Sequence, residues 1–272
     1  MIKTFCRNCG SKKLWKLSNG EYRCSVCKRD FKPYPVEGLR LTKKEWRKLI
    51  KLFLLGVNSP TLAEEIERSI ATTGKALRLI RCCMQQDVPK EIFSGTVEVD
   101  ETYLGGQKKN KRKSQLKKDK QIYSKESKRG FGTTKQPVFG ILCRSGKVYA
   151  KLVDNTEAKD LIPIITKRVR SGARICSDTW RAYTGLATKG YVHRTVEHRK
   201  KEYTQGKNHI NGLEGFWGYL KRKLAAKGGI RRKHLYLFLS EYVWRYNFKS
   251  WSLKEKTDRL LVNLYTNFSA KY

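Results

Sequence analysis

The sequence predicts an α/β protein in which a mixed sheet of about five strands is preceded by two small N-terminal units. Three observations support this prediction. Two pairs of cysteines open the chain, apolar residues then recur at helical spacing, and alternating apolar stretches begin at residue 96. The second pattern is typical of amphipathic helices and the third of strands. Strands that alternate with helices indicate an α/β domain.

Positive charge dominates the composition. The 272 residues include 60 Lys and Arg against 24 Asp and Glu, a formal net charge of +36. So large an imbalance indicates a polyanionic partner, either nucleic acid or an anionic membrane. Hydrophobic residues make up 39% of the chain, which excludes a mainly disordered tail protein. Without a run of about 18 apolar residues or a signal-peptide stretch, the chain is expected to stay inside the cell.

Four of the eight cysteines form a metal-binding pattern. Two C-x2-C pairs stand fourteen residues apart, formed by Cys6, Cys9, Cys24 and Cys27. Each pair can direct two thiolates at one ion, and two pairs complete a tetrahedral zinc shell. Asn19-Gly20 lies between the pairs and is a strong hairpin signal, so residues 1–35 are predicted to form a zinc ribbon. Two alternatives stay open: zinc only stabilises this small unit, or the ribbon also binds DNA.

Residues 36–92 are predicted to form a small helical domain. The first helix begins with a capping box made by Thr42 and Glu45, and two shorter helices are expected over 61–70 and 73–84. Three such helices fit a helix-turn-helix fold, with a generic helical connector as the alternative. The last helix would present three basic residues to DNA: Lys75, Arg78 and Arg81.

From residue 96 onward, strands and helices alternate. A helix is expected over 157–170, where Pro163 would kink or shorten it. Residues 93–230 are assigned to one α/β domain, which the C-terminal helices in 231–272 would complete. A basic stretch, residues 107–135, carries 12 Lys or Arg against two acids and is predicted to be a solvated loop. The expected strands are 96–104, 137–143, 147–153, 173–177 and 191–196.

Three carboxylates stand out in a chain with so few acids. Asp100 lies in the first of these strands, Asp178 ends the fourth, and Glu214 lies on an amphipathic helix. Carboxylate oxygens suit Mg²⁺, and two such ions about 3.5–4 Å apart can hold the attacking and leaving oxygens of a phosphodiester. Lys221 lies two turns after Glu214 and could hold a phosphate. Asn211 lies one turn before Glu214. The alternative is that these acids only form salt bridges.

Other residues are expected to be structural. Glu98 shares a strand face with Asp100 and is given a supporting or salt-bridged role. The remaining cysteines are interpreted as small buried side chains. The aromatic run in 235–246 is interpreted as core packing.

Three motifs resemble those of the DDE transposases of bacterial insertion sequences. They are VEVDETYLGG around Asp100, Ser177-Asp178 with Tyr183, and HINGLEGFWGYLKR over 209–222. The set is most similar to the ISXO-like group, which is related to the eukaryotic Merlin transposases. The cysteine ribbon and helical segment also match that group's N-terminal layout, so the resemblance covers most of the chain.

The resemblance implies an RNase H-like catalytic domain. Two Mg²⁺ ions, with Mn²⁺ as a substitute, would be held by Asp100, Asp178 and Glu214, and Lys221 would be the basic residue that follows the glutamate. Asn211 and Arg222 would contact DNA. The substrate would be the terminal inverted repeats of double-stranded DNA, bound by a homodimer or higher oligomer on the nucleoid of a prokaryotic cell.

Two rival functions stay open. One is a catalytically silent, transposase-derived repressor that binds DNA. The other is a metal-dependent nuclease that cuts strands without joining them. Short inverted repeats and a target duplication in the DNA that flanks the gene would favour the transposase.

Overall fold

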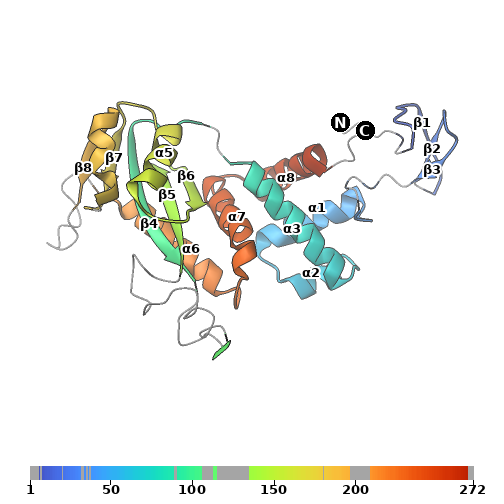
Figure 1. The fold of residues 1–272 in the computed structure, drawn as a ribbon. Coiled ribbons are helices and arrows are strands. Elements are labelled where there is room, and N and C mark those ends of the chain that lie inside the picture. The colour runs from blue at the N-terminus through green and yellow to red at the C-terminus, as the bar shows by residue number, and fades with distance from the viewer. Residues whose placement is uncertain are drawn as a thin grey trace. The chain divides into compact units, whose positions relative to one another are not determined.

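The structure is a computed structural model in which the chain forms two compact units (Figure 1). The first comprises residues 1–87 and 250–272, and the second comprises residues 88–249. The structure describes residues 6, 8–19, 21–31, 34, 36, 38–88, 91–105, 113–114, 135–179, 181–196 and 209–268.

The predicted ribbon is a three-stranded antiparallel sheet in the first unit. It consists of β1 (Leu14–Lys16), β2 (Tyr22–Cys24) and β3 (Asp30–Phe31), in that spatial order. Asn19 accepts a hydrogen bond from the Glu21 N–H at 3.0 Å and so stabilises the hairpin turn. The hairpin predicted from the sequence is confirmed.

Among its described residues, the first unit also contains four helices: α1 (Lys43–Leu55), α2 (Ser59–Glu65), α3 (Ile70–Gln86) and α8 (Leu253–Phe268). The capping box is confirmed, since the Thr42 N–H donates to Glu45 and the Glu45 N–H donates to the Thr42 hydroxyl. One face of α1 is buried, as its apolar spacing predicts.

The second helix differs from its predicted range. It begins at Ser59 because Asn58 accepts from the Thr61 N–H at 3.0 Å, and Pro60 occupies the first turn, where proline is favourable. The helix ends at Glu65, before the turn to α3. In turn, Ser69 caps α3, which therefore starts three residues earlier than expected.

Helix α8 packs along α1 and α3. Arg47 and Asp258 form an ion pair at 2.6 Å, and Arg259 donates twice to Asp87 at 2.6 Å. We expected all of residues 231–272 to complete the α/β domain, but the structure places this last helix in the first unit.

The second unit contains the predicted mixed sheet of five strands. Its spatial order is β6-β5-β4-β7-β8, in which β6, β5 and β4 are antiparallel and β4, β7 and β8 are parallel. This order, with the first strand central and the fourth beside it, is the RNase H-like topology. The bounds are β4 (Thr96–Leu104), β5 (Gln136–Cys143), β6 (Val148–Leu152), β7 (Arg174–Ser177) and β8 (Val192–Thr195).

Helices cover both faces of this sheet (Figure 1). One face packs against α5 (Ala158–Arg168) and the 3₁₀ helix η2 (Arg181–Lys189), and the other against α6 (Asn211–Ala225) and α7 (Leu235–Asn247). A short 3₁₀ turn, η4 (Arg232–His234), precedes α7. Pro163 lies within α5, which continues past it. Most of the predicted basic stretch over 107–135 lies outside the described residues.

Candidate active site and zinc site

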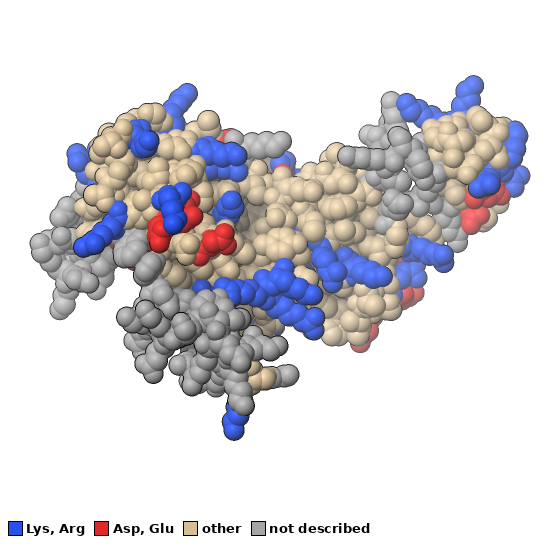
Figure 2. Space-filling view, viewed as in Figure 1, with Lys and Arg blue, Asp and Glu red and all other residues tan. Residues whose placement is uncertain are grey.

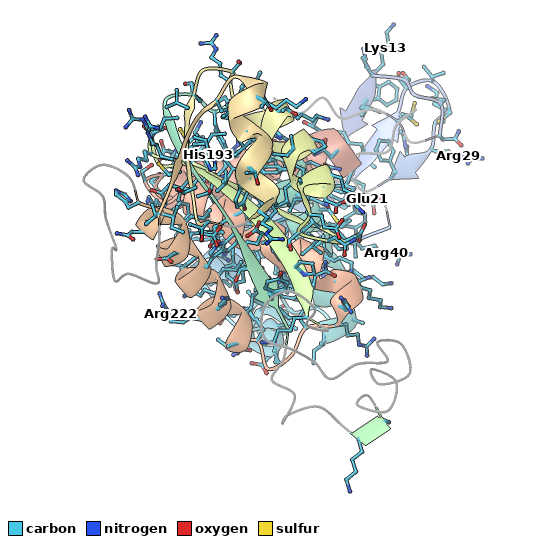
Figure 3. The ribbon with its side chains drawn as sticks, turned by 60° about the vertical axis from the view of Figure 1, so that its left-hand side comes forward. Lys13, Glu21, Arg29, Arg40, His193 and Arg222 are labelled. Carbon is cyan, nitrogen blue, oxygen red and sulfur yellow. The ribbon has the colours of Figure 1, made fainter. Side chains whose placement is uncertain are left out.

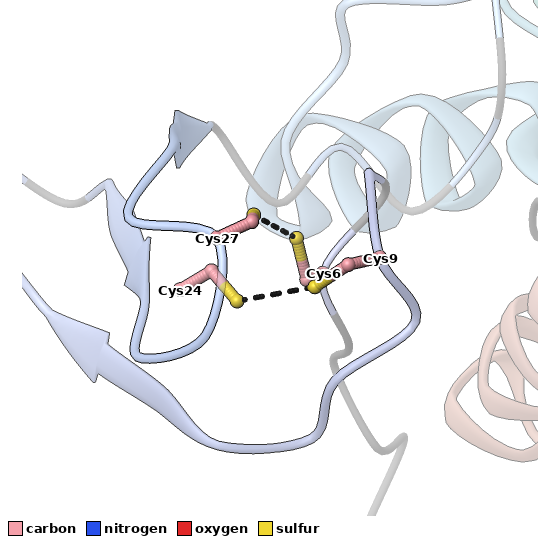
Figure 4. Close-up of side chains that lie close together, drawn as sticks. All are labelled: Cys6, Cys9, Cys24 and Cys27. Carbon is pink, nitrogen blue, oxygen red and sulfur yellow. Dashed lines mark hydrogen bonds between the residues drawn. The ribbon is translucent and has the colours of Figure 1, made fainter.

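The four N-terminal cysteines lie together, as their spacing predicts (Figure 4). Their sulfur atoms lie within 4.8 Å of one another, and two Sγ–Sγ pairs are 3.5 Å apart: Cys6–Cys27 and Cys9–Cys24. A tetrahedral ion with Zn–S bonds of about 2.3 Å needs sulfur atoms about 3.8 Å apart. The donor set therefore fits a structural zinc ion.

The two cysteine turns share one backbone design. In each turn the first cysteine accepts a hydrogen bond from the backbone N–H two residues later. The Asn8 N–H donates to Cys6 Sγ and the Val26 N–H donates to Cys24 Sγ, both at 3.4 Å. Burial opposes ionisation of Cys24, but the N–H groups of Cys27 and Val26 and the neighbouring thiols lower its pKa to about 6. Although the backbone of Ser11 opposes the shift, burial and the other three thiols raise the pKa of Cys9 to about 12, so without a metal the four thiols ionise as an interacting set.

Asp100 lies on β4, on the face that α6 covers. Its side chain is half-buried, and its Oδ2 accepts a hydrogen bond from Trp217 Nε1 at 3.0 Å. Burial raises the pKa of Asp100 to about 7, and the charges of Asp178 and Glu214 push that pKa in the same direction. The three acids chosen from the sequence are therefore close enough for their charges to interact.

Asp178 comes directly after β7, the parallel neighbour of β4. The register pairs Thr96 with Arg174 and Glu98 with Cys176, so two residues further on Asp178 is level with Asp100. The buried Ser177 hydroxyl donates to the Asp178 carbonyl at 2.7 Å and so stabilises the end of the strand.

Glu214 lies in the first turn of α6 and is exposed. The turn is held by Glu98, whose Oε2 accepts from the Leu213 N–H at 2.9 Å. Glu98 is 1% exposed and pairs with Arg144 at 3.2 Å, while Arg144 also donates to the His209 carbonyl at 3.0 Å. The supporting, salt-bridged role predicted for Glu98 is confirmed.

The acid cluster is open rather than closed around an ion. Within the described part of the chain, the cysteines are the one group of three or more His, Cys, Asp or Glu side chains close enough to hold a metal. An open set still suits Mg²⁺, which usually keeps several waters and binds one or two carboxylates together with substrate phosphates. The metal-binding role of the three acids stays a prediction.

The basic and polar residues predicted to contact DNA occupy two helices. On α6, Asn211, Lys221 and Arg222 are exposed, and Arg222 extends from the side of the helix (Figure 3). On α3, Lys75 and Arg78 are exposed, but the Arg81 guanidinium lies over the Phe53 ring, 5.3 Å from its centroid. Arg81 is thus half-buried and partly used in packing.

Lys and Arg side chains spread over the visible face of both units, whereas Asp and Glu form a few small groups (Figure 2). This distribution suits a polyanion that contacts much of the surface. Among the described residues, no helix is both long enough and apolar enough to cross a membrane.

One contact at the site was missed from the sequence. The spacing of α6 predicts that Trp217 is buried, but not that its indole donates to Asp100. A signal was present in Gly140, which lies within β5 directly opposite Asp100. An isolated glycine inside a strand indicates close approach of another group. Here that group is the Trp217 ring.

Replacing Asp100 by Asn is expected to stabilise the metal-free protein near pH 8. The carboxyl of the unfolded chain ionises near 3.8, whereas folding raises its pKa to about 7, so stability falls as the pH rises between these values. At 1.36 kcal/mol per pKa unit, the gain is at most about 4 kcal/mol above pH 7 and vanishes below pH about 4. Urea unfolding of the wild type and the variant at pH 4 and pH 8, in the presence of EDTA, measures this gain in the free energy of unfolding. An equal effect at both pH values would contradict the buried, repelled carboxylate.

The comparisons with known proteins identify the family. The model of the ISXO2-like transposase domain matches residues 92–247, more than half of the chain. The chain belongs to this transposase family. The matched residues fall within the second unit of the transposase, residues 88–249.

Two relatives support the assignment. A transposase-like protein of Haemophilus influenzae is 35% identical over 101 residues, which are 37% of this transposase and 81% of that protein. A protein in the transposable element ISH50 of Halobacterium salinarum is 23% identical over 256 residues, 89% of this chain and 84% of that one. A crystal structure of a pre-cleavage Mos1 transpososome aligns over 87% of this chain and 82% of the other, with 11% identity and a TM-score of 0.26.

Proposed function

We propose that this transposase cuts and joins DNA with Asp100, Asp178 and Glu214 as the ligands of two Mg²⁺ ions, for which Mn²⁺ can substitute. The observation that carries the proposal is the placement of the three acids: Asp178 is level with Asp100 on the parallel neighbour of β4, and Glu214 lies in the first turn of α6, which hydrogen-bonds to β4. Burial raises the pKa of Asp100, and the charges of Asp178 and Glu214 raise it further. Carboxylates that repel one another are costly to ionise unless a bound cation offsets their charge.

The chemistry consists of two in-line displacements. Water first attacks a phosphodiester at the end of the transposable DNA element. This attack forms one P–O bond, breaks another and releases a DNA 3′-hydroxyl. That hydroxyl then attacks a phosphodiester of the target, again exchanging one P–O bond for another. Bound Mg²⁺ supplies activation of the attacking oxygen and charge neutralisation at the leaving oxygen. Lys221, exposed two turns after Glu214, contacts a phosphate near the scissile bond as a point charge.

DNA is bound by surfaces of both units. The exposed Lys75 and Arg78 of α3 contact the terminal inverted repeats, and Asn211 and Arg222 of α6 contact DNA beside the carboxylates. Arg81 has a smaller part, because its guanidinium already lies over Phe53. Since an element has two ends, a homodimer or higher oligomer assembles on the DNA of the prokaryotic nucleoid.

The proposal is tested with DNA duplexes that carry the inverted repeats found beside the gene. We expect wild-type protein with Mg²⁺ to cleave at the repeat end and to join that end to a second duplex. Glu214→Gln should lose both activities, by at least about 10³-fold, or about 4 kcal/mol of transition-state stabilisation. Glu157→Gln is the matched control, since Glu157 is an exposed acid of the same unit and forms an ion pair with Lys159 at 2.8 Å.

The rival functions predict different outcomes. A silent repressor binds the repeats without cleaving them, with or without Mg²⁺. A nuclease cleaves but gives no joined product. Cleavage by Glu214→Gln at the wild-type rate would show that the triad is wrongly assigned.

A further inference from the structure

We propose that Trp217 is a positioning residue, which orients the Asp100 carboxylate so that one of its oxygens is held and the other faces the metal. This inference rests on the proposed function, because it gives the carboxylate a metal to face. It concerns a side chain that touches neither substrate nor metal and acts through Asp100.

The contact itself is specific. The Trp217 Nε1–H donates to Asp100 Oδ2 at 3.0 Å, and Trp217 is only 4% exposed. An indole has a single donor and no acceptor, so this N–H satisfies its hydrogen bond with the carboxylate. A carboxylate has about four acceptor positions on its two oxygens, so the bonds from Trp217 and from the Glu101 backbone N–H still leave acceptor positions for a metal. It also fixes the rotation of the carboxylate.

Gly140 makes room for this indole. Residue 140 lies directly across β4–β5 from Asp100, and a Cβ built there would be 2.5 Å from Trp217 Cζ2 and 2.7 Å from Cη2. The ring therefore lies against the backbone of the strand opposite Asp100. Any side chain at position 140 would push the ring, and with it the N–H, away from the carboxylate.

A second hydrogen bond holds α6 on β4. Glu98 and Asp100 are two residues apart on one face of β4, and Leu213 and Trp217 are one turn apart on one face of α6. Each acid accepts one hydrogen bond from the helix, and Glu214 lies between the two donors. The two bonds together fix where Glu214 stands relative to Asp100.

Packing alone would not need the nitrogen. A phenylalanine at position 217 would still fill much of the space between α6 and the sheet. A purely structural role thus predicts that only stability changes when the N–H is removed. A positioning role predicts a loss of metal affinity as well, about 10–100-fold as for other groups that orient metal ligands.

The experiment measures Mn²⁺ binding to the full chain by electron paramagnetic resonance. We expect Trp217→Phe to weaken Mn²⁺ binding about 10–100-fold, whereas Trp244→Phe, which removes another buried indole of the same unit, leaves it near the wild-type value. Gly140→Ala should weaken binding in the same direction while keeping the indole. Gly185→Ala is its control, because a Cβ there meets nothing within 4 Å.

Wild-type affinity in Trp217→Phe, or equal losses in Trp217→Phe and Trp244→Phe, would overturn the proposal. If the variants fail to fold, nuclear magnetic resonance of the wild-type protein tests the same proposal. The Trp217 indole N–H resonance should move during a Mg²⁺ titration while that of Trp244 stays in place, and an unmoved Trp217 resonance also overturns it. If Asp178→Asn binds Mn²⁺ as tightly as the wild type, the triad fails, while a selective loss in Trp217→Phe still stands.

Discussion

Asp178→Asn is expected to abolish Mg²⁺-dependent strand cleavage and joining, by at least about 10³-fold, while DNA binding stays nearly intact. The substitution removes one negative charge and one anionic oxygen at a position level with Asp100. It preserves the size of the side chain and leaves the hydrogen bond from the Ser177 hydroxyl to the backbone carbonyl of residue 178 in place. In the proposed function DNA is bound by exposed Lys and Arg side chains elsewhere, so the affinity for DNA should stay near the wild-type value.

The measurement pairs a cleavage and joining assay with a binding titration at fixed salt. Asp154→Asn is the control, since Asp154 is an exposed acid of the same unit that follows β6 at the edge of the sheet. If Asp178→Asn still cleaves, the triad assignment is wrong. If it loses DNA binding together with cleavage, Asp178 has a role in the fold instead.

Chelating zinc is expected to unfold the ribbon and to spare the second unit. Three strands of two or three residues cannot form a core of their own, whereas structural zinc contributes about 10–16 kcal/mol of apparent binding energy in small zinc-dependent units. Hydrogen exchange read by mass spectrometry should show lost protection over residues 8–31 and unchanged protection in β4 and β5.

Cys24→Ser should have the same effect as the chelator, because it removes one of the four thiolates. Cys82→Ser is the matched control: Cys82 lies on α3, outside the cluster. Loss of protection throughout the second unit would contradict the modular organisation predicted from the sequence.

The sheet was predictable because its signals are local. The bounds predicted for β4 from its sequence are those of the structure, because Val97 and Val99 alternate with polar residues and this pattern can be recognised without knowing the partner strand. Pro60 lies in the first turn of α2, where proline is favourable, so this helix begins two residues before the predicted start at residue 61.

Long-range partners could not be predicted in this way. The apolar stripe of α8 indicates that one face is buried, but its partners, α1 and α3, lie nearly 200 residues earlier in the chain. The same limit applies to Trp217. Periodicity predicts that its ring is buried, whereas the bond from its nitrogen to Asp100 depends on how α6 packs against β4.

The packing of α8 against α1 and α3 affects the order in which the protein can fold during synthesis. A ribosome makes the chain from its N-terminus, so the first three helices emerge long before the fourth. Residues 88–249, which include the whole family-matched segment, leave the ribosome in between. The unit that carries the carboxylates is therefore fully synthesised while the helical unit still lacks a helix. A transcript that ends early produces a chain with its acids in place and its helical unit incomplete.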